Sequence, residues 1–201
     1  MNETTHAGTQ AGPETVLDAA LRVGRRIAAD AQWQGDACTW VVITPDRSSP
    51  GSRKGIPATA SGMLYEGTSG IALFLAELAA VTGDEEVARA ALGGIRFSLN
   101  EGPGLGETAF GYHSGRVGVA YATARVGELL GRPELYAEAE ALLRPLAGNE
   151  ARDMGMDVIA GGGGGIPALL QLTKYVDAEL ALGIARKLGD NLIEVAARDA
   201  D

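Results

Sequence analysis

The feature that most constrains the fold of this chain is a motif that occurs three times after residue 64. Each copy is a Gly-x-x-Gly pair followed by an apolar run that starts within one or two residues of the second glycine. Successive pairs begin 48 and 46 residues apart. A period of this length is typical of proteins that stack one supersecondary unit repeatedly. The glycines of the three pairs are Gly67 and Gly70, Gly115 and Gly118, and Gly161 and Gly164.

Each unit predicts two helices. The first helix follows the glycine pair and is apolar on nearly all faces, which indicates burial on most sides (71–81, 119–130 and 166–175). The second carries its charges on one side (85–100, 134–147 and a helix that starts at Asp177). An inner ring of apolar helices within an outer ring of amphipathic ones predicts an all-α fold, an α/α toroid. A solenoid of stacked helix pairs satisfies the same period.

The paired glycines are predicted to be structural turns, either because φ is positive or because another backbone segment approaches closely. Five consecutive glycines, 161–165, also suggest a phosphate loop. A P-loop requires Gly-Lys-Ser/Thr, whereas Gly165 is followed by Ile166 and Pro167. A dinucleotide fingerprint matches such a run by chance. The extra glycines, Gly162, Gly163 and Gly165, predict an unusually flexible loop.

The remaining segments complete a single domain. Residues 1–13 are small and polar and predict a flexible tail, and 14–31 predicts an amphipathic helix. Residues 34–61 contain a brief β-like run, TWVVITPD, and then many Pro, Gly and Ser residues, which predicts a long loop. The domain is expected over 14–201, with repeats near 64–100, 111–147 and 157–198.

Net charge and cysteine content exclude several kinds of partner and site. A net charge of −9 argues against nucleic acid, whose phosphates require clustered Lys and Arg. Cys38 is the sole cysteine, so the chain forms no internal disulfide and no multi-cysteine metal site. The N-terminus lacks the pattern of a secretory signal, and no apolar run is long enough to span a membrane. We therefore expect a cytoplasmic protein.

The three motifs together resemble the lanthionine synthetase C-like family, especially the cyclase domain of bifunctional lanthipeptide synthetases. The resemblance lies in LYEGTSGIALFLAEL at 64–78, GYHSGRVGVAYA at 111–122 and DVIAGGGGGIPALL at 157–170. It implies a toroid of about seven helix-pair repeats, of which this chain holds about the first three. It also implies an activity, the addition of cysteine thiols to dehydroalanine or dehydrobutyrine in a dehydrated precursor peptide.

The resemblance also implies zinc, which the family's later repeats bind through Cys, Cys and His. Cys38 lies outside the repeats, so we expect no metal ligands in this chain. The chain is then either part of a longer cyclase or a shortened relative that dimerises, works with another subunit or has lost the reaction. Some kinase-fused family members lack these ligands, which leaves metal-free cyclisation open. The expected partners are the precursor peptide and a dehydratase or kinase-like protein or domain. Self-association is expected through an apolar flank left exposed after the third repeat.

The resemblance implies two catalytic candidates. Asp157 matches the family's acid–base aspartate; alternatively it caps a helix or pairs with Arg152. His113 lies two residues before Gly115, the offset at which later repeats place a zinc-binding cysteine; alternatively it forms a hydrogen bond at a helix start. The motif positions expected to face the substrate are Tyr65, Glu66, Tyr112, Ser114 and Arg116.

Two other functions satisfy the same patterns. A helical repeat module without catalytic activity binds a peptide or a partner protein in its concave face. A glycan-processing α/α barrel requires paired carboxylates at its mouth, for which Glu66 and Asp157 are the available candidates.

Overall fold

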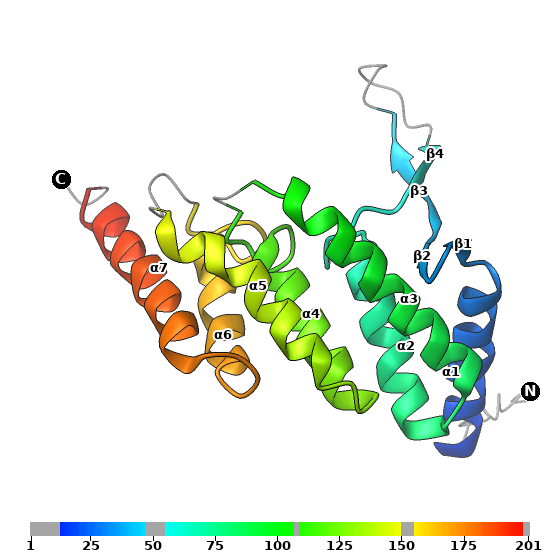
Figure 1. Cartoon of the computed structure of the whole chain (residues 1–201). Helices are drawn as coiled ribbons and strands as arrows, with labels where there is room; N and C mark the ends of the chain where they lie inside the picture. Colours follow the sequence, from blue (N-terminus) through cyan, green and yellow to red (C-terminus); the bar gives the residue numbers. More distant parts are fainter. Residues whose placement is uncertain (1–12, 47–54, 107–108, 150–154, 199–201) are drawn as a thin grey trace, which may run out of the picture.

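The computed structural model describes residues 13–46, 55–106, 109–149 and 155–198 (Figure 1). The described chain contains seven α-helices, one short 3-10 helix and four short strands. The helices are α1 (Pro13–Ala29), α2 (Thr68–Thr82), α3 (Glu85–Glu101), α4 (Arg116–Leu129), α5 (Glu134–Gly148), α6 (Gly162–Leu172) and α7 (Ala178–Arg198), with the 3-10 helix η1 at Gly102–Gly104. The strands are β1 (Gln32–Gln34), β2 (Ala37–Thr39), β3 (Val41–Pro45) and β4 (Gly55–Thr59).

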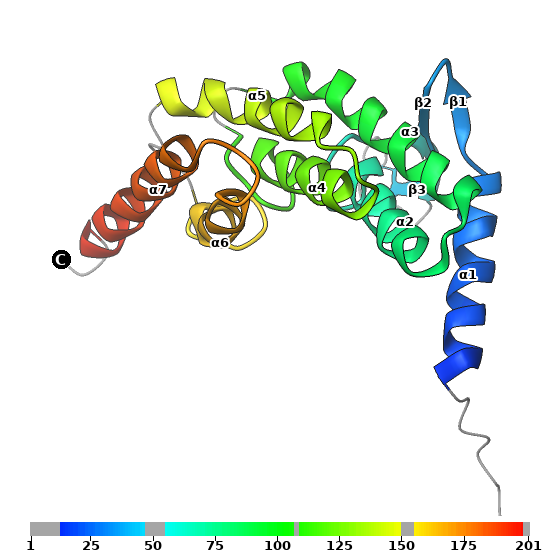
Figure 2. The same cartoon turned by 60° about the horizontal axis from the view of Figure 1, so that its bottom comes forward.

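Three helix pairs follow one another along the molecule. The two helices of each repeat pack together, α2 with α3, α4 with α5 and α6 with α7. Contacts between α2 and α4 and between α4 and α6 join the first helices into one row (Figures 1 and 2). The second helices form a layer over this row, as the tilted view shows (Figure 2). The predicted all-α fold of repeated helix pairs is therefore confirmed, and the first helices form the inner row.

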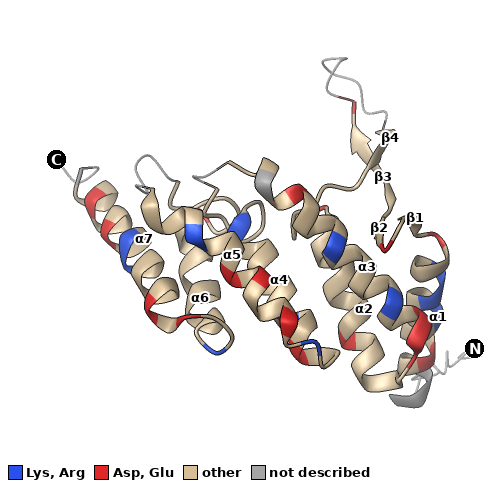
Figure 3. Cartoon of the chain, viewed as in Figure 1, with Lys and Arg blue, Asp and Glu red and all other residues tan. Residues whose placement is uncertain are grey.

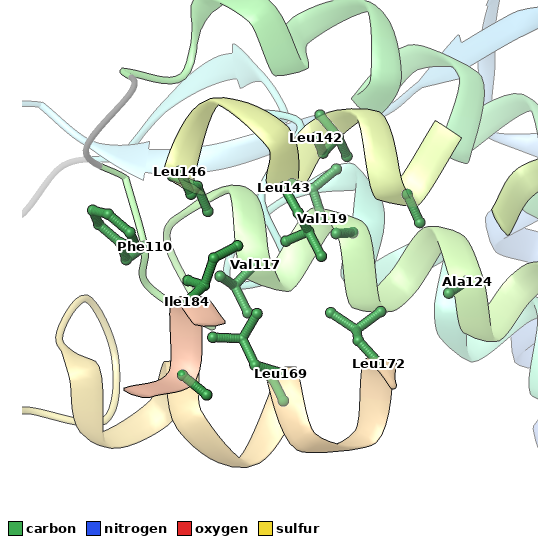
Figure 4. Close-up of a cluster of buried hydrophobic side chains, with 14 of the residues drawn as sticks. Phe110, Val117, Val119, Ala124, Leu142, Leu143, Leu146, Leu169, Leu172 and Ile184 are labelled. Atoms are coloured by element: carbon green, nitrogen blue, oxygen red, sulfur yellow. The ribbon is translucent and has the colours of Figure 1, made fainter. Parts of the chain in front are cut away.

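The core consists of two clusters of buried apolar side chains. One joins the second and third repeats, where Leu143 of α5, Leu169 of α6 and Ile184 of α7 surround Val117 at the start of α4 (Figure 4). The other joins the first repeat to α1 and to the segment around Cys38 and Trp40. Because each cluster includes side chains from successive units, the repeats share buried apolar surface and stabilise one another.

The segment 34–61 is not the long loop that its composition predicts. It contains most of an antiparallel pair β1–β2, with Gly35 in the turn at φ 65°, and the whole of an antiparallel pair β3–β4. The buried indole of Trp40 donates to the Ile27 carbonyl of α1 at 2.7 Å, and the thiol of Cys38 donates to the Ala90 carbonyl of α3 at 3.4 Å. The Pro, Gly and Ser residues that suggested a loop lie partly in β4 and partly in 47–54, which is outside the described residues.

Helix starts are defined by local chemistry. Asp84 caps α3, because its carboxylate accepts a hydrogen bond of 3.0 Å from the Val87 amide. The same carboxylate lies 2.7 Å from the guanidinium of Arg25, which joins α1 to α3. Pro133 is the residue before α5 rather than its first helical residue, a small difference from the prediction. The predicted tail was 1–13, but Pro13 begins α1; residues 1–12 lie outside the described residues.

Candidate functional site

In each repeat, the same backbone hydrogen bond joins the motif loop to the start of the inner helix that follows it. Each inner helix begins after an N-cap glycine whose position offers no side chain for capping. A carbonyl from the preceding loop accepts the hydrogen bond instead, and it lies at the same offset in every repeat. The three bonds are Thr68 N to Ser61 O at 2.7 Å, Arg116 N to Ala109 O at 2.8 Å and Gly162 N to Gly155 O at 3.0 Å. Backbone groups thus satisfy helix-start amides that side chains usually cap.

Close approach, and not positive φ, explains the paired glycines. None of the six belongs to the described glycines with positive φ, which are Gly35, Gly83 and Gly131. A Cβ on the second glycine of each pair would overlap a loop carbonyl oxygen: that of Leu64 at Gly70, of Tyr112 at Gly118 and of Val158 at Gly164. The glycines therefore let each loop fold back onto the first turn of its own helix.

The run of five glycines is not a flexible loop. Gly161 is the N-cap of α6, and Gly162–Gly165 form the first turn of that helix. The side chain of Leu188 in α7 lies close to Gly165, where a Cβ would stand 2.9 Å from its Cδ1. Small residues at this end of α6 thus permit close packing against α7.

A backbone ladder brings the three motif loops side by side. The amide of Tyr65 donates to the carbonyl of His113 at 2.8 Å, and the amide of His113 donates to the carbonyl of Ile159 at 3.0 Å. All three residues stand two positions before the first glycine of their pair. Equivalent positions of successive repeats are therefore direct neighbours, and the side chains next to them gather at one edge of the inner row.

Asp157 lies two residues before Ile159, the last member of this ladder. Its Oδ1 accepts hydrogen bonds of 2.7 Å from the amides of Ile159 and Ala160. These bonds, the one from Ala160 foremost, lower the pKa of the exposed carboxyl from its ordinary value. Asp157 is therefore a carboxylate at neutral pH. It is not the N-cap of α6, which is Gly161, and Arg152 lies outside the described residues.

A cavity of about 280 Å³ opens between the second and third loops. The rings of Tyr112 and His113 lie edge to face with centroids 4.8 Å apart, and the rings of Tyr112 and Tyr121 are 5.5 Å apart. Burial raises the pKa of Tyr112, so its hydroxyl stays protonated. The lining residues are Tyr112, His113, Tyr121, Val158, Gly163, Gly164, Pro167, Ala168 and Gln171. The cavity is thus a mainly apolar site with a few polar groups, the usual form of a ligand pocket.

The other predicted motif residues are placed differently. The half-exposed ring of Tyr65 lies edge to face with His113, with centroids 6.1 Å apart. Ser114 donates weakly to the Ile159 carbonyl at 3.5 Å, and Glu66, at φ 55°, lines a separate cavity beside α2. Arg116, which we expected to face the substrate, is instead buried and donates to the carbonyls of Leu105 and Gly106, which joins the start of α4 to the loop before it.

Two lining residues were missed by the sequence analysis. Tyr121 lies in α4 and Gln171 in α6. Both come after the glycine pair of their repeat, outside the motif positions that were predicted to face the substrate. Their signal is a side chain with a polar group in a helix that was expected to be apolar on nearly all faces. A polar atom that is kept where burial is expected indicates either a hydrogen-bond partner or a site.

The described residues do not fit the zinc that the resemblance implies. They contain no group of three His, Cys, Asp or Glu side chains able to hold a metal ion. Cys38 is buried in the core beside α3, and burial raises the pKa of its thiol to about 11. A zinc ligand must be a thiolate, which this environment disfavours.

Repeated helix pairs with glycine-paired loops along one edge define an all-α repeat protein with a pocket at that edge. The sequence model of the family described as "Lanthionine synthetase C-like protein" matches residues 59–200, and the chain belongs to this family. A search of curated proteins found no match. Of the helices that the structure describes, none has both the length and the apolar character needed to cross a bilayer.

Proposed function

We propose that this chain supplies part of the peptide-binding and proton-transfer surface of a lanthionine-forming cyclase. Its substrate is a precursor peptide that carries cysteine together with dehydroalanine or dehydrobutyrine. The observation that carries the proposal is the backbone ladder, which places Asp157, His113 and the pocket at the edge where the three family motifs meet.

The reaction moves one proton and forms one bond. The cysteine thiol loses its proton to a base, and the sulfur adds to the β-carbon of the dehydro residue. The resulting enolate then takes a proton at its α-carbon, and the product is a thioether. Asp157 is exposed and stays ionised because backbone amides lower its pKa, so its carboxylate is available to accept a hydrogen bond or a proton from the thiol, as a weak base. The imidazole of His113 lines the pocket, and imidazole is the side chain that most often serves as a general acid or base.

The pocket suits one side chain of such a peptide. Tyr112 and Tyr121 offer ring edges and hydroxyls, whereas Val158 and Ala168 offer apolar surface. A volume of about 280 Å³ is just below the usual range of ligand sites, which is consistent with room for one side chain. The dehydro residues must come from a dehydration reaction, so a dehydratase or kinase-like protein or domain is the expected supplier. The thiol must stay reduced, which suits the cytoplasm.

The test is the consumption of thiols. The chain is incubated with a dehydrated, cysteine-containing peptide, with and without added zinc, and free thiols are counted over time. We expect thiol loss above the uncatalysed rate. A rate equal to the uncatalysed one under both conditions contradicts the catalytic proposal.

A steric variant tests the pocket. Val158 is 60% exposed and lines the cavity, so Val158→Trp fills its mouth without disturbing the core. We expect slower thiol loss and weaker peptide binding. Val81→Trp is the matched control, because Val81 is 70% exposed at the far end of α2. Equal activity of the two variants contradicts a role for the pocket.

A further inference from the structure

A cavity of about 360 Å³ opens beside the first motif loop, and we call it the first-repeat cavity. Leu64, Gly70 and Phe74 belong to its lining. Counted from the glycine pairs, they hold the same positions in the first repeat as three lining residues of the pocket hold in the third. Those equivalent residues are Val158, Gly164 and Ala168. The two cavities are thus related by the repeat.

The opposite wall differs between the two cavities. In the pocket, the preceding repeat supplies this wall through Tyr112, His113 and Tyr121. In the first-repeat cavity, Ile27 of α1 and Val42 of β3 line the space instead. The first-repeat cavity is therefore enclosed by two walls and is not simply the open end of the row of repeats.

In the later repeats, a side chain of the preceding repeat lies against the second glycine of the pair. A Cβ added at Gly118 would stand 3.3 Å from the Cβ of Leu64, and one added at Gly164 would stand 3.3 Å from the Cβ of Tyr112. At Gly70 the three nearest atoms all belong to the backbone of Leu64 in the same loop. The place that a leucine or a tyrosine takes in the later repeats is therefore left open in the first.

The backbone ladder has an unused acceptor at the same end of the row. The carbonyl of His113 accepts from the amide of Tyr65, in the preceding repeat. Among the residues that the structure describes, no group donates to the carbonyl of Tyr65 itself. Because Tyr65 and His113 are equivalent, their carbonyls face the same side of their repeats, which for Tyr65 is the side of the first-repeat cavity. The open side-chain place and the unused acceptor thus occur together.

Glu66 gives this cavity a single charge. It is the one charged residue of the described lining, its side chain is exposed, and it forms no ion pair within the described ranges. Asp and Glu residues occur on helices along the whole molecule (Figure 3), and the net charge of the chain is −9. A ligand of this cavity therefore gains from a positive charge near its apolar part.

We infer that an extended peptide segment, with an apolar residue followed within two positions by a basic one, adds to the ladder at Tyr65. A peptide N–H donates to the Tyr65 carbonyl, and the side chain of the residue before it enters the cavity against Gly70. Leu64 and Tyr112 make the same pair of contacts inside the protein, one residue before each ladder amide. Addition of a peptide to free backbone groups is a recurring mode of recognition.

The inference rests on the proposed function for the identity of the ligand, the precursor peptide, and adds a second attachment point for it. The reaction is proposed at the pocket between the second and third loops, whereas this segment binds at the first. Because the ladder joins the three loops along one edge, a single extended peptide can contact both cavities.

Backbone methylation of a peptide probe tests the predicted hydrogen bond. The full chain is titrated with a fluorescently labelled peptide, Ser-Ala-Leu-Tyr-Lys-Ser, and binding is followed by anisotropy. One derivative is N-methylated at the tyrosine, the ladder donor, and a matched one at the lysine, whose N–H points the other way in an extended chain. We expect saturable binding that weakens about fivefold or more in the first derivative only. No binding, or equal binding of the two derivatives, overturns the inference.

Variants of the protein assign the site. Phe74, 39% exposed, forms the apolar wall, so we expect Phe74→Ala to weaken binding about threefold or more. We expect a smaller loss, about twofold, from Glu66→Gln, and less of it at high salt. Leu170→Ala is the matched control, because Leu170 is 50% exposed on α6 and lines neither cavity. Equal binding by Phe74→Ala and Leu170→Ala overturns the assignment to this cavity.

Light scattering without peptide tests whether a second copy of the chain covers the cavity instead. We expect the same mass for wild type and Phe74→Ala. A wild-type dimer that Phe74→Ala dissociates overturns the inference. The probe contains neither a thiol nor a dehydro residue, so its binding is measured independently of thiol addition, and failure here is distinguishable from failure of the cyclase proposal.

Discussion

The carboxylate of Asp157 and the backbone amide of Ile159 form a hydrogen bond of 2.7 Å at the end of the ladder that joins the three motif loops. In the two preceding repeats the equivalent amides, of Tyr65 and His113, donate to the carbonyl of the next repeat. At Ile159 the side chain of Asp157 supplies the acceptor instead. Asp157 thus stabilises the loop, and its exposed carboxylate belongs to the residue next to Val158 of the pocket lining.

Replacement of Asp157 by asparagine separates these two roles. Asn retains an oxygen that accepts the amide bonds but loses the negative charge, so we expect the fold to persist and thiol addition to fall by about tenfold or more. Asp177→Asn is the matched control, since Asp177 accepts from the amides two and three residues ahead of it in the same way. If both variants lose activity equally, the loss comes from the change in net charge, and the result contradicts a specific role of Asp157 in proton transfer. Thermal unfolding checks the fold.

Gly118→Ala is expected to destabilise the protein, because the new Cβ would overlap the Tyr112 carbonyl. Overpacking of this kind costs about 1–3 kcal/mol, and here the obstacle is backbone that a rotamer change cannot remove. Gly189→Ala in α7 is the control. A Cβ there meets no atom within 4 Å, so we expect a gain of about 0.5–1 kcal/mol from helix propensity. Urea denaturation measures both, and equal stability of the two variants would contradict the explanation.

Asp84→Ala is expected to lower the free energy of unfolding by about 1 kcal/mol at pH 7 through loss of the α3 cap. Asp84→Asn should cost less, because asparagine also caps and loses only the ion pair with Arg25. The Val87 amide, and then Arg25, lower the pKa of Asp84 from 3.8. Its stabilisation is therefore complete above that value and is lost as the pH falls through the lowered pKa. The difference between wild type and Asp84→Ala, measured by urea denaturation, should shrink in acid; a difference that does not vary with pH contradicts this assignment.

Cys38 is expected to react with a thiol reagent only after unfolding. Its side chain is fully buried, and burial raises its pKa from 9.0 to about 11. The folded state then holds the proton more tightly than the unfolded state, so stability falls as the pH rises from about 9 towards 11. Cys38→Ala should remove this part of the pH dependence. Rapid labelling of the native protein at pH 8 would contradict the burial of the thiol. Cys38 would then also be counted among the free thiols in the assay of peptide cyclisation.

The helices were predictable because their signal is local. The amphipathic pattern of 85–100 and the apolar runs after Gly67, Gly115 and Gly161 place α2 to α7 within a few residues of their observed bounds. The β1–β2 and β3–β4 pairs were not predictable in the same way. Their strands are three to five residues long and are held by contacts with α1 and α3, such as the bond from Trp40 to Ile27, that no local pattern encodes.

The sequence by itself determined the repeat, the helix pairs, the family and the need for glycine at six positions, because periodicity and the absence of a Cβ are properties of the chain alone. Only the tertiary structure decided that these glycines admit loop carbonyls and not positive φ, that Arg116 is buried, and that Tyr121 and Gln171 join Tyr112 and His113 at one pocket. The pocket depends on distances between segments about forty residues or more apart, which packing of the repeats sets. The glycine and Arg116 contacts depend on how each loop folds back onto the helix that follows it, which residue types alone do not specify.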